Sequence, residues 1–162
     1  MILNDFNLEY LSNIMNLFKQ KRKKLDDMLN ITNSQTNAIV TEETDLMEQL
    51  ISEKQSCINS VDMLNEKLKT LINDLKINLG INSLDQLIDC DTPEIQELRE
   101  LVSDISCVLE KIEVLEKQNS EMMRKLLDKK RQQIKDIAQG KKALTAYSKN
   151  YLKSSHYFNK NK

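Results

Sequence analysis

The sequence is very poor in proline, glycine and aromatic residues. Its 162 residues include one Pro, two Gly, no Trp and 4% aromatic residues. Folds made of many short strands need Gly or Pro turns about every 8–12 residues, so β-sandwiches, small barrels and propellers are excluded. The two glycines, Gly80 and Gly140, are too far apart to form a glycine-rich phosphate-binding loop.

Residues that bind metals or form disulfides are equally scarce. The chain has one His, and its three cysteines, Cys57, Cys90 and Cys107, are widely spaced. No Cys or His pair has metal-ligand spacing, so we expect no metal site and no cofactor. An odd number of separated cysteines is typical of reduced thiols in a cytoplasmic protein. Cys57 and Cys107 lie in apolar helical stretches, so we expect both to be buried or half-buried.

Long hydrophobic runs are also absent. No apolar run reaches the ~18 residues that a membrane span requires. Residues 1–5 lack the basic start and apolar stretch of a signal peptide. We therefore expect a cytoplasmic protein without a membrane span.

What the sequence does contain is apolar residues that repeat every seven positions, in two rows offset by three or four. The repeat covers residues 7–40, then a stretch from a break near Thr41 to Leu79, then a stretch from Pro93 to about Tyr151. Such a repeat places one apolar stripe along one face of a helix. The pattern predicts an all-α fold: an elongated antiparallel bundle or coiled coil of three long helices.

Local signals indicate where the first two helices end. Residues 30–37 are polar and β-branched, which predicts either a bend there or a helix that persists to about Val40. Thr41 is expected to cap the N-terminus of the second helix. Gly80 is expected to end that helix, because glycine tolerates the left-handed conformation that follows a last helical turn.

The connector over residues 80–92 carries two further signals. Ser83 and Gln86 have the spacing of a capping box, which predicts a helical turn over 84–88. Thr92 followed by Pro93 is the clearest helix start in the chain, because Thr caps well and Pro suits the first helical position.

The third helix is longer than its partners can cover. At 1.5 Å per residue it would be about 85 Å long, against about 50–60 Å for each of the others. We therefore expect its C-terminal helical segment to project, to bend away or to pack on something else. Within a single domain of residues 1–162, we assign 1–136 to the bundle body and 137–162 to a basic C-terminal segment.

This segment supplies the candidate binding residues, which are apolar and lie at helical spacing. They are Ile137, Leu144, Tyr147, Tyr151 and Leu152. Gly140 is either a hinge or a tolerated surface glycine. Asn119, on the apolar seam, either contacts a partner or sets the register of the bundle, and we favour the second interpretation.

Charge is distributed unevenly along the chain. Residues 124–162 hold twelve basic and two acidic residues, whereas residues 1–123 have a net charge of −11. Four of the seven aromatics, Tyr157 and Phe158 among them, fall in the last sixteen residues. A basic, aromatic end can bind nucleic acid, but without a recognised motif it is more often a solvated face, so we do not expect nucleic acid as the partner.

No group of residues in the sequence indicates catalysis. His156 lies in a polar tail without a paired nucleophile, and helical Asp and Glu residues on outward faces are usually solvated charges. Catalysis needs a concave and partly desolvated pocket, which a thin helical bundle rarely offers. We therefore expect no enzyme activity.

Residues spread over nearly the whole chain carry a family resemblance. They are residues 29–39, then Leu46, Leu50-Ile51, Lys54-Gln55, Ile58, Val61-Asp62 and Leu64, then Leu79-Gly80-Ile81 and Ser83-Leu84, and finally Asn119, Gly140-Lys141-Lys142-Ala143 and Ala146-Tyr147. With these residues the chain resembles the FlgN-type flagellar export chaperones of Gram-positive bacteria. Its tail, residues 158–162, departs from the ending with an aromatic, Asp and two Lys that many members have.

The resemblance implies a non-enzymatic cytoplasmic chaperone. Such proteins hold hook-associated subunits, which form the hook–filament junction, before export through the flagellar type III apparatus. In the family the C-terminal helical region binds the client. A client helix laid on the apolar stripe would be shielded from premature assembly.

Two other classes explain parts of the pattern. A self-associating coiled-coil scaffold accounts for the heptads equally well and predicts a tight homodimer. A basic-tailed nucleic-acid-binding helical protein accounts for the charge and predicts binding that falls steeply with salt.

Overall fold

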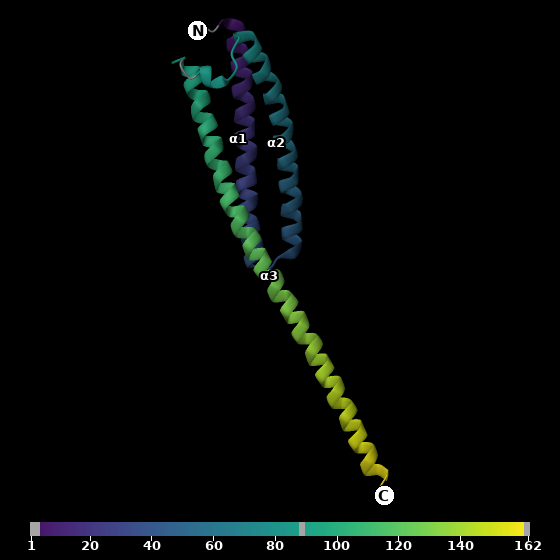
Figure 1. The fold of residues 1–162 in the computed structure, drawn as a ribbon. Coiled ribbons are helices and arrows are strands. Elements are labelled where there is room, and N and C mark those ends of the chain that lie inside the picture. The colour runs from purple at the N-terminus through teal and green to yellow at the C-terminus, as the bar shows by residue number, and fades with distance from the viewer. Residues whose placement is uncertain (1–3, 88–89, 161–162) are drawn as a thin grey trace. The chain divides into compact units, whose positions relative to one another are not determined.

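The computed structural model describes the backbone of residues 4–87 and 90–160, and the side chains of this range as far as residue 153. Within these residues the chain forms three long α-helices and no strand (Figure 1). Helix α1 spans Asp5–Val40, α2 spans Thr44–Leu79 and α3 spans Pro93–Lys160, with a short 3₁₀ helix, η1, at Leu84–Leu87. The predicted all-α fold of three long helices is confirmed.

The chain divides into two compact units. The first, Met1–Asn119, contains α1, α2, η1 and the first part of α3, and the second, Ser120–Lys162, contains the rest of α3. This division differs from the predicted one between residues 136 and 137, which separates a body from a binding segment by function and remains a prediction.

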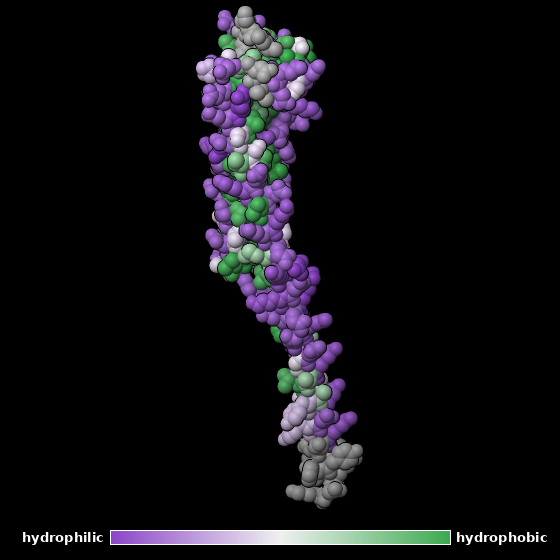
Figure 2. All heavy atoms as spheres, turned by 60° about the vertical axis from the view of Figure 1, so that its left-hand side comes forward, coloured by the Kyte–Doolittle hydropathy of each residue, from purple (hydrophilic) through white to green (hydrophobic). Residues whose placement is uncertain are grey.

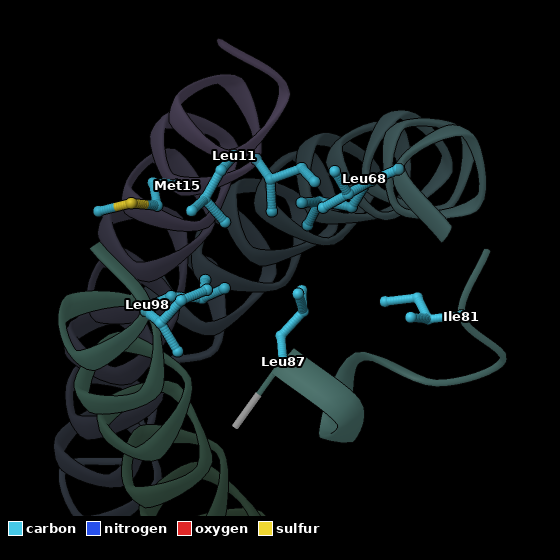
Figure 3. Packing of buried hydrophobic residues seen from close by; sticks show 9 residues of the cluster. Leu11, Met15, Leu68, Ile81, Leu87 and Leu98 are labelled. Atoms are coloured by element: carbon cyan, nitrogen blue, oxygen red, sulfur yellow. The ribbon is translucent and has the colours of Figure 1, made fainter. Parts of the chain in front are cut away.

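The core of the first unit forms around α1, beside which α2 and the first part of α3 lie (Figure 1). One buried cluster gathers side chains from α1, α2, the connector and α3: Leu11, Ile14, Met15, Leu68, Leu75, Ile81, Leu87, Ile95 and Leu98. Figure 3 shows members of this cluster from all four segments pointing toward a common centre. The connector is therefore part of the core and closes one end of the bundle.

A second cluster joins α1 to α3 further along the bundle. Leu25 of α1 is buried against Ile105, Val108 and Ile112 of α3, and Val61 of α2 packs on this cluster from the side. Leu25 is only 1% exposed. Truncation of such a side chain to Ala typically costs about 2–5 kcal/mol, so these contacts hold the three helices together.

Some polar residues lie on the helix sides that face one another in the first unit, and they bond to residues of other helices. Arg22 of α1 lies 3.1 Å from a carboxylate oxygen of Asp104 on α3. The amine of Lys54 on α2 donates to Gln35 Oε1 of α1 at 3.0 Å and pairs with Glu116 of α3. Burial lowers the pKa of Lys54 below its usual value. Because a slipped register would bury this amine without its partners, these contacts favour one alignment of the helices.

Asn119 is the last residue of the first unit and is buried against α1. Its Oδ1 accepts a hydrogen bond from the hydroxyl of Thr36 at 2.7 Å, and its Nδ2 donates to the carbonyl of Thr32 at 3.1 Å. This contact within the chain supports the register-setting interpretation of Asn119. Of the two alternatives for residues 30–37, the helix that persists to Val40 is the one observed. The polar side chains of Gln35 and Thr36 bond to residues of α2 and α3.

One expected helix cap is wrong. Thr41 ends α1 instead of starting α2, and its hydroxyl donates to the carbonyl of Asn37 at 3.0 Å. Glu42 then takes the left-handed conformation, with φ of 56°, and the N–H of Glu43 bonds to Ala38 O at 2.9 Å. This is the hydrogen-bond pattern of a helix C-terminus, so the α2 start is displaced to Thr44, after Glu43, which makes no side-chain cap.

The other boundaries follow the sequence signals closely. Gly80 has φ of 64° after α2, and the next N–H, of Ile81, bonds to Lys76 O at 3.0 Å. Thr92 Oγ1 accepts a hydrogen bond from the N–H of Ile95 at 3.4 Å at the start of α3.

The predicted turn after Gly80 is η1, but both side-chain hydrogen bonds differ by one residue from those of a capping box. Ser83 Oγ accepts from the N–H of Asp85, and Gln86 Oε1 accepts from the N–H of Asn82 instead of Ser83. The last residue of that predicted turn, Ile88, lies outside the described residues.

The cysteines show where a local pattern misleads. Cys57 is half-buried as expected, but Cys107 is exposed, so the prediction for Cys107 is wrong. Ile105 and Val108 supply the inward positions of this turn of α3. Cys107, two residues after Ile105, is rotated by about 200° from it and faces outward.

Replacing Gly80 by Ala should lower the free energy of unfolding by about 1 kcal/mol, because a Cβ strains the left-handed backbone. An added Cβ would meet no atom within 4 Å, so the cost lies in the backbone alone. Urea unfolding measures the change. Gly80→Asn is the matched control and should cost less, since Asn tolerates this conformation; equal stability of all three chains would contradict the prediction.

Asn119→Ala should lower the free energy of unfolding by about 1–3 kcal/mol, because two hydrogen bonds between α1 and α3 are lost in a buried place. Ser120→Ala changes the exposed neighbour and should leave the unfolding free energy unchanged. Thermal melting followed by circular dichroism compares the two variants. If the melting temperature of Asn119→Ala equals that of the wild-type chain, the interpretation that Asn119 sets the register is wrong.

Candidate functional site

The five predicted binding residues all lie on α3 in the second unit, and all are exposed. Their side chains are between 60% and 72% exposed: Ile137, Leu144, Tyr147, Tyr151 and Leu152. Large apolar side chains scattered singly on a surface need no explanation, but a contiguous set indicates an interaction site. The arrangement of these residues around the helix therefore decides how they are interpreted.

Four of the five share one narrow face of the helix. Ile137, Leu144 and Tyr151 repeat every seven residues, and Tyr147 follows Leu144 by three. At 100° per residue these four side chains fall within an arc of about 80°. Figure 2 shows the apolar and pale residues of this unit along one edge, with hydrophilic residues along the other. We call these four residues the apolar stripe.

Leu152 lies at the border of the stripe, about 60° around the helix from Ile137. Ile134 falls at the same angle, five turns earlier, and is 67% exposed. Ile134 was not among the predicted binding residues, although its three-residue spacing from Ile137 was a usable signal. The two residues widen the exposed apolar face on one side.

Gly140 also falls on the apolar stripe, three residues after Ile137 and four before Leu144. Helix α3 continues through it without interruption, and a Cβ added there would meet nothing within 4 Å. The stripe therefore has a gap between two large side chains, in a helix whose own packing does not require glycine.

The opposite face of this helix is basic. Lys135, Lys142 and Lys149 lie about 180° from the centre of the stripe. Earlier in the unit, Arg124 bonds to Glu121 at 2.8 Å and to Asp128 at 3.1 Å. The hydrogen bond from Arg124 lowers the pKa of Glu121, so this turn is internally paired. No acidic residue follows Asp136, and the stripe therefore lies on a purely cationic stretch.

Three other kinds of functional feature were considered from the sequence: the aromatic tail, a metal site and a membrane span. The aromatic residues Tyr157 and Phe158, and also His156, lie beyond the last described side chain. In the described part of the chain, no three His, Cys, Asp or Glu side chains are placed to hold a metal ion. None of the helices described there combines the length and hydropathy that crossing a bilayer needs.

The first unit has its own apolar hollow beside η1. It is a hollow of about 280 Å³, and its lining combines six apolar residues with two polar ones: Phe18, Leu84, Leu87, Ile95, Leu98 and Val102, with Asp85 and Arg99. Most of its apolar lining belongs to the core cluster or packs on it. The hollow therefore adjoins the core, whereas the apolar stripe of α3 has no such packing.

The described residues form an all-α protein with a buried core in its first unit and an exposed apolar stripe on α3. A contiguous exposed apolar stripe of this kind is typical of proteins that bind other proteins. A family model described as FlgN protein matches residues 4–154. The chain therefore belongs to the FlgN family of flagellar export chaperones. No curated protein and no solved structure is found to match the chain.

Proposed function

We propose that this chain is a cytoplasmic, non-catalytic chaperone that binds hook-associated proteins of the hook–filament junction. In this proposal residues 137–162 are the client-binding segment and residues 1–136 are the body. The observation that carries it is the apolar stripe on α3, whose residues are all more than half exposed. The family supplies the class of client.

The proposed mechanism is the docking of helix on helix. A terminal helix of the client lays its own apolar face on Ile137, Leu144, Tyr147 and Tyr151. Burying a Leu-sized side chain at such a contact contributes about 1.5–3 kcal/mol, so a few residues suffice for specific binding. While bound, the client helix cannot pair with other subunits, and the complex is then delivered to the export apparatus.

Charge argues against the two other classes. Pairing this segment in register with the same segment of a second copy would bring two cationic stretches together, which costs binding energy. Nucleic acid would neutralise the lysines, but it would leave the apolar stripe unburied. A client helix with an apolar face accounts for the stripe directly.

The test replaces two stripe residues together, Leu144→Glu with Tyr151→Glu, in the full-length chain. Both side chains are exposed, so the melting temperature should change by less than about 2 °C, whereas loss of a core side chain would lower it far more. Binding to a purified hook–filament junction protein of the same bacterium should weaken at least about tenfold, which corresponds to about 1.4 kcal/mol.

The matched control adds the same two charges elsewhere on the helix. Gln139→Glu with Ala146→Glu places both on exposed positions away from the stripe, and binding should change much less. Calorimetric titration and thermal melting report the two quantities. Equal weakening by both pairs would mean that only charge matters, and unchanged binding by the first pair would move the client site to the first unit. A collapsed melting temperature would show that the stripe is core.

A further inference from the structure

We infer that Gly140 is the point of closest approach on the apolar stripe, where a client helix with acidic flanks inserts a large apolar side chain. The inference rests on the proposed function and specifies the partner of that same site. Gly140 is one member of a row in which residues follow one another at alternating spacings of three and four. The row is Ile137, Gly140, Leu144, Tyr147 and Tyr151. Every other member of that row is large and exposed.

The fold does not explain this glycine. Gly80 is needed by its own helix end, where φ is 64°, but Gly140 has no positive φ and lies inside α3. An added Cβ at residue 140 would touch nothing within 4 Å. A glycine inside a helix destabilises it relative to Ala, and among the described residues no close contact requires glycine at this position.

A partner helix would account for the glycine. When two helices pack along such a seam, each large residue fits between four residues of the facing helix. Without a side chain at residue 140, the space between Ile137 and Leu144 is empty. It admits a bulky side chain of the partner, and it lets the two backbones come closer than elsewhere along the stripe.

The charge of the segment specifies the rest of the partner. Lys141 lies beside Gly140 at the border of the stripe, and Lys142 and Lys149 lie on the opposite face. Every Asp, Glu, Lys or Arg position after Asp136 is a lysine, so the charge along the Lys141 border of the stripe and on the opposite face is positive. A helix with acidic side chains beside its apolar face is attracted to it, and this attraction acts chiefly on the association rate.

The experiment enlarges residue 140 in the full-length chain. Gly140→Leu should weaken binding of a synthetic peptide with the terminal helix of a hook–filament junction protein at least tenfold, and Gly140→Ala should weaken it less. Helix content by circular dichroism should stay equal or rise, because both residues form helix better than Gly. Ala146→Leu adds apolar volume away from the stripe and should leave binding unchanged.

A size exchange tests the fit directly. Among peptides in which each large apolar residue is truncated to Ala in turn, one should bind the Gly140→Leu chain better than the unaltered peptide does. Coupling of this kind is expected for two positions that are in contact or share the same space, and not for distant ones. If Gly140→Leu binds as tightly as wild type, the inference is overturned while the proposed function stands. If the wild-type chain binds neither peptide nor intact protein, both are overturned.

The acidic flanks are tested by rate. Raising NaCl from about 0.05 M to about 0.5 M should slow association of the peptide severalfold and change its dissociation much less. An association rate that does not depend on salt would overturn the inference that the partner has acidic flanks. A concentration-dependent dimer of the chain that Gly140→Leu dissociates would also overturn it, because the stripe would then bind a second copy. Displacement of the peptide by an RNA oligonucleotide would overturn it as well.

Discussion

Burial of the apolar face of α1 is the interaction on which the rest of the structure depends. Leu11 and Ile14 are covered at one end by α2, the connector and α3, and Leu25 is covered further along by α3 and α2. Of the three helices, only α1 and α3 contribute buried residues to both clusters. These contacts with α1 hold the first part of α3 in place. The reversal at Gly80 matters because it lets Ile81 and Leu87 close this core.

The buried polar residues of the first unit favour one alignment of its helices. Apolar side chains alone, on the facing sides of three helices, would pack in several registers with similar energy. Lys54 and Asn119 make the displaced registers costly, since each would be buried without its hydrogen bonds. Asn119 is also the last residue of the first unit, so its hydrogen bonds to α1 lie at the end of that unit.

The two glycines differ in whether the fold requires them. Gly80 has a conformational reason within its own chain, and the fold accounts for it completely. Gly140 has none, and it interrupts a row of exposed apolar residues on a cationic helix. A residue that lowers stability and has no structural role within its own chain is a candidate for contact with a partner. Gly140 and the apolar stripe both lie in the segment for which we propose client binding.

The sequence by itself determined the helices, most of their ends and the candidate residues on α3, because periodicity, glycine and the Thr92-Pro93 start act through local geometry. Tertiary structure alone decided which apolar positions are buried. The same three- and four-residue spacing places Ile112, which is buried, and Leu144, which is exposed. The role of Thr41 was also undecided locally, since Thr can end one helix or begin the next. The physical reason is that a repeat sets which side of a helix a residue occupies, whereas burial requires another helix to cover that side.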